Sequence, residues 1–221
     1  MAKNEISIAL YGKKNISDFS YAKRIMAYCE EAGLLWTKID DKEPVRKEYS
    51  LYWLEKLWSS PKYAGLDKDS LSLNTHVLGN QGRGGASFHI GWRQNNPNRY
   101  NPFYIYVPYK KFFAQRNSFE QLFFNLIDLL EPDCSYIEND NFGHKCRSNN
   151  LRHFNITQDV HWISYFSNKY MKEMNIDIKS LQWNKQIDLS QGTVFYICDD
   201  VPKDDDLSEK ICLEYRDLLW E

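Results

Sequence analysis

One amphipathic stretch constrains the fold more than any other part of this 221-residue chain. Ser118, followed three residues later by Gln121, has the spacing of a helix capping box. Pro132 marks the end of the stretch, because proline cannot continue a helix. Between these points the apolar residues fall on one helical face: Phe119, Leu122, Phe123, Leu126, Leu129 and Leu130. We therefore predict a long helix that packs into the core.

Alternation of apolar and polar residues predicts several strands. Residues 6–10 alternate Ile and Leu with small residues, and residues 86–93 alternate apolar with polar ones. The aromatic run 103–108 follows a loop rich in Asn and Pro, so we expect a hairpin there. Residues 193–198 are β-branched and aromatic, which favours another strand. The polar stretch 133–158 has only four apolar hints of short strands: Tyr136, Ile137, Phe154 and Ile156.

Helical spacing predicts four further helices. The first is capped by Ser17, contains Phe19, Ala22, Met26 and Cys29, and ends at Gly33; the others cover Glu48 to Trp58, Val160 to Met174, and Asp204 to the end. Residues 63–85 are expected to be a polar connection. No repeat or composition break divides the chain. We predict one α+β domain, residues 1–221, with a mostly antiparallel sheet packed against several helices.

Composition excludes several classes of protein. The net charge of −2 argues against a protein that neutralises many phosphates, so direct nucleic-acid binding is not expected. No apolar run is long enough to span a membrane, and the first residues lack the order of a signal peptide. The five cysteines form no CxxC pair and are interpreted as reduced thiols: Cys29, Cys134, Cys146, Cys198 and Cys212. We expect a cytoplasmic protein.

Candidate catalytic and metal-binding patterns fit poorly. The glycine-rich stretch 79–85 precedes a strand instead of opening a helix, and it lacks the lysine of a phosphate-binding loop. Cys134, His144, Cys146 and His153 do not have zinc-ligand spacing. His161 falls in a helical pattern, where a structural histidine is commoner than a base. We predict no cofactor, no metal and no enzymatic activity; the alternatives are a small hydrolase or metal-dependent enzyme, and a self-assembling adaptor.

The C-terminal end has an unusual charge. Residues 199–221 carry a net charge of −6, whereas the other 198 residues carry +4. Such asymmetry can steer a basic partner, although acids at 204–206 also suit the start of a helix. We predict that partner binding involves this acidic group and a second patch at the end of the strand 86–93. The candidate partner-binding residues are Asp199, Asp200, Asp204, Asp205, Asp206, Trp92 and Arg93, with the loop 95–101 beside the last two.

The order of short motifs resembles the immunity protein 52 family of bacterial polymorphic toxin systems. The motifs that carry the resemblance are residues 9–12 (ALYG), 86–91 (ASFHIG), Asn98, Val107-Pro108, 129–133 (LLEPD), 160–166 (VHWISYF) and 192–195 (GTVF). They occur in order over most of the chain. His161 replaces a glycine that is usual in the family, and Tyr11 stands where Trp is frequent.

The resemblance implies a function without catalysis. Members of this family are inhibitors that bind a cognate toxin in the cytoplasm of the producing cell. For this family the expected toxin is a nuclease of the restriction-endonuclease fold. The resemblance therefore predicts an immunity protein that occludes the active or substrate-binding surface of that nuclease.

Overall fold

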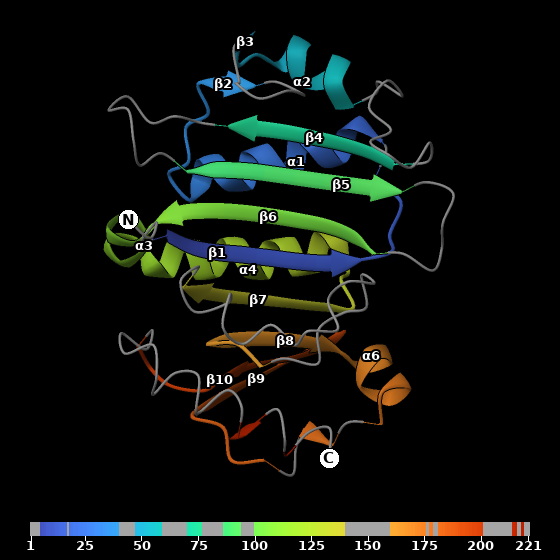
Figure 1. Ribbon diagram of the computed structural model, residues 1–221, viewed down its shortest axis with the longest axis vertical. Coiled ribbons are helices and arrows are strands. Elements are labelled where there is room, and N and C mark those ends of the chain that lie inside the picture. Colours follow the sequence, from blue (N-terminus) through green and yellow to red (C-terminus); the bar gives the residue numbers. More distant parts are fainter. Residues whose placement is uncertain are drawn as a thin grey trace.

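Eight antiparallel strands form one sheet that extends through the whole molecule (Figure 1). The structure is a computed structural model that describes residues 5–16, 18–39, 47–58, 70–76, 86–93, 100–139, 160–175, 177–178, 181–200, 214–215 and 218. At 70–76, 89, 91–93 and 101 only the backbone is described. The strands are β1 (Glu5–Gly12), β4 (Ser70–His76), β5 (Ser87–Arg93), β6 (Asn101–Pro108), β7 (Cys134–Asn139), β8 (Ile163–Ser167), β9 (Lys185–Leu189) and β10 (Gly192–Tyr196).

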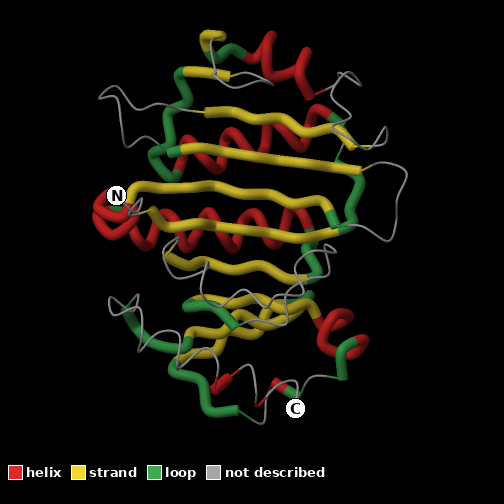
Figure 2. Tube along the Cα trace, in the orientation of Figure 1, coloured by secondary structure: helices red, strands yellow, loops and turns green. Residues whose placement is uncertain are grey.

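The strand order is β4-β5-β6-β1-β7-β8-β10-β9, and every neighbouring pair is antiparallel. A second sheet contains only β2 (Lys38–Ile39) and β3 (Lys47–Glu48). The helices are α1 (Phe19–Glu31), α2 (Leu51–Trp58), α3 (Tyr109–Ala114), α4 (Arg116–Leu130) and α6 (Asn168–Glu173). Helices α1 and α4 lie side by side across one face of the large sheet (Figure 2). This arrangement confirms the predicted α+β fold.

The two faces of the sheet differ in chemistry because side chains alternate along each strand. In β1, Ile6, Ile8 and Leu10 are buried in the main core with α1 and α4. Antiparallel pairing places Val107, Ile105 and Phe103 of β6 opposite them. The alternate β1 residues, Glu5, Ser7, Ala9 and Tyr11, belong to the opposite side of the sheet, which we call the second face. There they pair with Pro108, Tyr106, Tyr104 and Pro102 of β6 and with Glu138, Tyr136 and Cys134 of β7.

A smaller core covers part of this second face. Phe166 of β8 and Phe195 of β10 pack there against Tyr170 of α6. The Phe166 and Tyr170 rings are stacked with centroids 5.6 Å apart, and Trp183 packs on Phe195 at 4.7 Å. Helix α6 and the segment that follows it therefore cover the β8 and β10 end of the second face.

The predicted end of α1 is confirmed in detail. Gly33 has a φ of 78°, which is the left-handed conformation that glycine adopts without strain. Its amide donates to the carbonyl of Glu30, and the Leu34 amide donates to that of Cys29. This pair of bonds is a Schellman motif, which satisfies the last carbonyls of a helix. At the start of α1 the capping side chain is Asp18, which accepts from the Ser20 amide, and not the predicted Ser17.

The core helix also begins earlier than predicted. Helix α4 starts at Arg116, so Ser118 is its third residue and its amide donates to the Gln115 carbonyl. The capping box predicted at Ser118 and Gln121 is therefore wrong. Helix α2 starts at Leu51 and not at Glu48, because residues 47–48 pair with β2 and Ser50 accepts from the Trp53 amide.

The helix predicted from Val160 to Met174 is wrong in its first half. Residues 163–167 form β8, and only 168–173 are helical. The strand is buried on both faces, with Tyr165 in the main core and Phe166 in the smaller one, so it lacks the alternation of a half-buried strand. The connection predicted at 63–85 contains β4. The glycine-rich stretch 79–85 and nearly all of the C-terminal helix lie outside the described residues.

Candidate functional site

Four tyrosines form a connected group on the second face of the sheet, which we call the tyrosine face: Tyr11, Tyr104, Tyr106 and Tyr136. The hydroxyl of Tyr11 lies 2.7 Å from that of Tyr104 and 3.1 Å from that of Tyr136, so both pairs are hydrogen-bonded. Tyr104 and Tyr106 have stacked rings with centroids 6.1 Å apart. The group spans three adjacent strands, β6, β1 and β7.

The register of the sheet explains how residues so distant in sequence meet. Tyr104 pairs with Ala9 of β1, and Ala9 pairs on its other side with Tyr136. The methyl group of alanine leaves room above β1, which the Tyr11 ring spans from the next position on the same face. Burial, with smaller contributions from Tyr136 and Tyr104, raises the pKa of Tyr11 well above its usual value. The hydroxyl therefore stays protonated and can both donate and accept.

A buried polar pair supports one end of this group. Nδ1 of His161 lies 2.5 Å from Oε2 of Glu138, and the two residues are 4% and 0% exposed. The His161 ring stacks on Tyr136 with centroids 3.8 Å apart. Among the described residues, Oε1 of Glu138 and Nε2 of His161 have no hydrogen-bond partner. Such a pair fixes the ring of Tyr136 and gives this part of the face a defined shape.

Two of the predicted acids lie at one corner of the sheet. Asp199 and Asp200 follow β10 and are exposed. Asp199 accepts from the side-chain amide of Asn184 at 2.8 Å, and Asp200 lies 3.5 Å from the Arg116 guanidinium. Asp204, Asp205 and Asp206 lie outside the described residues. The structure therefore shows the position of only the first two of the five predicted acids.

The Arg116 side chain organises this corner. Its guanidinium binds Glu120 at 2.6 Å and lies over the ring of Trp162, 5.0 Å from its centroid. Glu120 also accepts from the Tyr196 hydroxyl at 3.0 Å. Arg116 thus compensates part of the charge of Asp200, and Asp199 contributes more to the outward negative field.

The structure does not bring the two predicted patches together. Trp92 and Arg93 end β5, where they pair with Leu71 and Ser70 of β4. Four strands separate β5 from β10, which corresponds to about 24 Å at the usual strand spacing. Five successive antiparallel pairings connect β5 to β10, so these two strands run in opposite directions and their C-terminal ends lie at opposite ends of the strands. These residues cannot form one continuous patch with Asp199 and Asp200.

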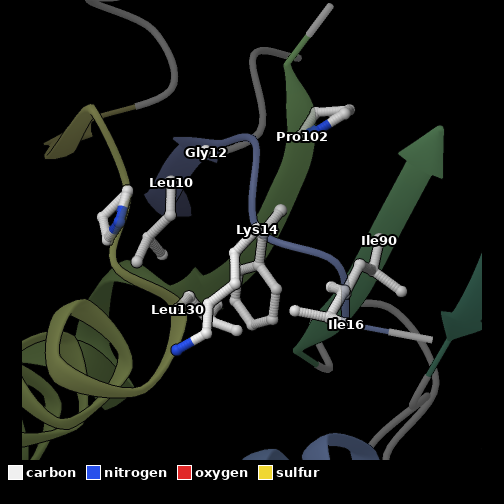
Figure 3. A pocket seen from close by; sticks show the side chains of 9 residues that line it. Leu10, Gly12, Lys14, Ile16, Ile90, Pro102 and Leu130 are labelled. Atoms are coloured by element: carbon white, nitrogen blue, oxygen red, sulfur yellow. The ribbon is translucent and has the colours of Figure 1, made fainter. Parts of the chain in front are cut away.

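A pocket lies at the end of the main core, between β1, β6 and α4. It holds only about 20 Å³ of free internal space, and it is lined by Leu10, Gly12, Lys14, Ile16, Ile90, Pro102, Phe103, Leu130 and Pro132. The Lys14 side chain crosses the pocket toward Leu130 (Figure 3). Its ammonium group donates to Glu131 at 2.6 Å and to the Leu129 carbonyl at 3.1 Å. The pocket is smaller than typical small-molecule sites. The positive charge of Lys14 in it is already compensated by Glu131.

Other reactive groups in the described part of the chain are protected or isolated. Cys29 and Cys134 are buried free thiols, and Cys198 is half-buried; burial raises the pKa of all three. Cys134 belongs to the smaller core, whereas His144, Cys146 and His153 lie outside the described residues. Across the described residues, no cluster of three His, Cys, Asp or Glu side chains could hold a metal ion. The described helices also include none with the length and hydropathy needed to cross a bilayer.

The fold is similar to that of a solved protein. The chain is similar to a solved Pseudomonas aeruginosa T6SS protein, PA0821, with a TM-score of 0.59. The two proteins share a fold. Their sequences are 17% identical, and the similarity covers 89% of this chain and 68% of PA0821. No family model matches the chain, and its sequence matches no curated protein. The immunity protein 52 assignment therefore stays a prediction.

The tyrosine face was missed by the sequence analysis, although a signal for it exists. Tyr104 and Tyr106 alternate with Phe103, Ile105 and Val107 in a strand whose apolar face was evident. Two tyrosines at alternate positions mark the second face of such a strand as aromatic and polar at once. Contact with Tyr11 and Tyr136 depends on the strand order, which the sequence does not specify.

Proposed function

We propose that this chain is an immunity protein of a type VI secretion context that binds and neutralises a cognate toxin in the cytoplasm of the producing cell. It would act by occlusion, without catalysis and without a cofactor. The observation that carries this proposal is the similarity of the fold to a T6SS protein over 89% of the chain. The order of short motifs that resembles the immunity protein 52 family supports the same role.

The resemblance further suggests a nuclease as the toxin. A nuclease must bind a phosphate backbone and therefore presents a basic surface. Asp199 and Asp200 are exposed carboxylates suited to steering such a surface, together with the acids at 204–206. A protein interface of about 1,600 Å² is enough for tight binding if a few well-packed aromatic anchors contribute most of the energy.

Co-expression tests this proposal. The product of the gene next to this one would be produced in a bacterial host, alone and together with the chain. We expect growth arrest in the first case and restored growth in the second, with a stable complex on size-exclusion chromatography. Intact mass of the toxin should be unchanged, because occlusion modifies nothing. Failure of the chain to restore growth, or rescue with a chemically altered toxin, would contradict inhibition by binding.

The acidic group has its own test in the same system. Reversing the charge of Asp199, Asp200, Asp204, Asp205 and Asp206 together should slow association and reduce its dependence on salt, while the domain stays folded. Stopped-flow fluorescence would measure the association rate constant at low and high salt. An unchanged rate constant would exclude this group as the steering surface and leave the toxin-binding role intact.

A further inference from the structure

We propose that Tyr215 is a latch that fastens the C-terminal acidic segment, residues 199–221, to the sheet beside Asp199. The inference rests on the proposed function, and it adds how the chain positions the acids that would steer the toxin. Tyr215 acts here as a positioning residue. The proposal follows from the contacts that residues 182–184 make with the described residues at the two ends of the segment.

Tyr215 is held by two different interactions with two consecutive residues. Its ring stacks on the Trp183 ring, with centroids 4.6 Å apart and an angle of 15° between the two planes. Its hydroxyl donates to the carbonyl oxygen of Gln182 at 2.7 Å. A stacked ring and a directed hydrogen bond together fix the position and the orientation of a side chain. The contact is therefore a specific docking point for this part of the chain.

The support under this docking point is itself fixed. The indole nitrogen of Trp183 donates to the Ile178 carbonyl at 2.9 Å. The Trp183 ring also packs on that of Phe195 in β10, with centroids 4.7 Å apart. Phe195 is buried and belongs to the smaller core. Tyr215 is therefore attached to the smaller core through Trp183.

The start of the acidic segment is held by the residue that follows Trp183. The side-chain amide of Asn184 donates to Oδ1 of Asp199 at 2.8 Å. Burial and, next, the interaction with Cys198 raise the pKa of Tyr215 above its usual value, so the residue before Asp199 also lies near this ring. Three consecutive residues, 182–184, thus contact both Asp199 and Tyr215, although these two lie far apart in the sequence.

Two anchors on one short segment determine where the acidic charge acts. A chain that is held at both ends explores a smaller volume than one that is held at one end only. Residues 199–221 carry a net charge of −6, and the latch keeps this charge at the corner where Asp199 and Asp200 lie. Charge that is concentrated at one place produces a stronger local field, which accelerates the encounter with a basic partner.

Amide hydrogen exchange tests the latch in the free protein. We expect Tyr215→Ala to raise the exchange rate of the peptide that contains residues 214–218 by at least about tenfold, because the docking point is lost. Tyr215→Phe keeps the ring and removes only the hydroxyl, so its increase should be smaller. Tyr52→Ala is the matched control. It deletes the same group from α2, where Tyr52 is 64% exposed, and it should leave this peptide unchanged.

Exchange in β1 and α4 shows whether the variants keep the fold, and we expect it to stay at the wild-type rate. If the peptide with residues 214–218 exchanges equally fast in wild type and in Tyr215→Ala, Tyr215 is not a latch. If Tyr215→Ala also accelerates exchange in β1 and α4, Tyr215→Phe decides. Wild-type exchange of the same peptide in that variant would then overturn the latch.

Association with the purified product of the adjacent gene tests what the latch positions. Stopped-flow fluorescence gives the association rate constant of each folded variant at low and at high salt. We expect Tyr215→Ala to associate at least about threefold more slowly than wild type at low salt, and this difference to shrink at high salt, where charges are screened. Tyr52→Ala should associate like wild type. Faster association, or a difference that is independent of salt, would show that Tyr215 does not act through the acidic charge.

The outcome for wild type separates the two proposals. If wild type does not bind the adjacent gene product, the proposed function fails, and the positioning role of Tyr215 fails with it. Hydrogen exchange still decides in that case whether the latch exists. If wild type binds and Tyr215→Ala associates at the same rate, the function stands and the latch does not position its acids.

Discussion

His161 and Glu138 form a buried pair in which Nδ1 and Oε2 are 2.5 Å apart. The pair joins the end of β7 to the residue that leads into β8, two strands that are adjacent in the sheet. The His161 amide also donates to Oγ of Ser164 at 2.8 Å, which fixes the backbone at this point. The polar pair thus connects the strand pairing of the sheet to the position of the Tyr136 ring.

Removal of Glu138 should destabilise the fold strongly. Breaking a buried pair by deleting one partner leaves the other without compensation, which costs about 3–5 kcal/mol. We expect a loss of this size in the free energy of unfolding for Glu138→Ala, measured by urea denaturation. Glu138→Gln keeps an acceptor for His161 and should lose less. Glu173→Ala breaks an exposed ion pair with Lys169 and should change stability by less than about 1 kcal/mol. Equal losses for the two alanine variants would contradict the structural role of the buried pair.

A methyl group at Gly192 should disturb the start of β10. A Cβ atom there would lie 2.3 Å from the Phe166 carbonyl oxygen and 2.7 Å from Cα of Ser167. Both are backbone atoms of β8, so the strands themselves would have to separate. We expect Gly192→Ala to destabilise the protein by at least about 1–3 kcal/mol. Gly12→Ala is the matched control, because its closest contact is 3.1 Å, and a loss larger than that of Gly192→Ala would contradict the packing.

Asp133 should make stability depend on pH. Burial, only partly offset by Lys169 and Lys13, raises the pKa of Asp133 above its usual value. The carboxyl therefore favours folding below its unfolded pKa of about 3.9, and this contribution is lost as the pH rises through the folded pKa. We expect Asp133→Asn to raise the melting temperature at pH 7, with the gain shrinking below about pH 4. A lower melting temperature than wild type at pH 7 would show that the charged form is stabilising.

Cys198 should be a slow nucleophile. Burial, followed by the charges of Asp199 and Asp200, raises the pKa of its thiol to about 11. Because only the thiolate reacts, alkylation by iodoacetamide at pH 8 should be on the order of 100-fold slower than in the urea-unfolded chain. Peptide mass spectrometry would follow this residue alone. The double variant Asp199→Asn, Asp200→Asn should react faster than wild type, and equal rates in native and unfolded chains would contradict the burial.

Periodicity predicted the elements whose two faces differ. The stripe from Phe119 to Leu130 and the alternation from Ile6 to Leu10 each have one apolar face, and both form the predicted type of element, although the helix begins earlier than predicted, at Arg116. Residues 163–167 are buried on both faces of the sheet, so their apolar residues follow no alternation and fit a helical spacing by chance. At the ends of elements, the choice of Asp18 over Ser17 as the cap depends on a shift of one residue that the pattern does not resolve.

The candidate site was less predictable than the fold for a different reason. The acidic residues at 199–200 can be recognised from the amino-acid sequence alone. The tyrosine face, in contrast, forms only because β1 lies between β6 and β7 in the sheet. Tyr11 and Tyr136 are 125 residues apart, and their hydroxyl contact depends on that strand order. Trp92 and Arg93 were predicted as a second patch, and only the order of strands shows that four strands separate them from the strand that precedes Asp199 and Asp200.

Titration of the adjacent gene product with the purified chain tests the account most directly. The account predicts that the two proteins form a complex and that the toxic activity of the gene product is lost in it, while the intact mass of that product stays the same. Absence of a complex, or a toxin that stays active within it, would contradict the account.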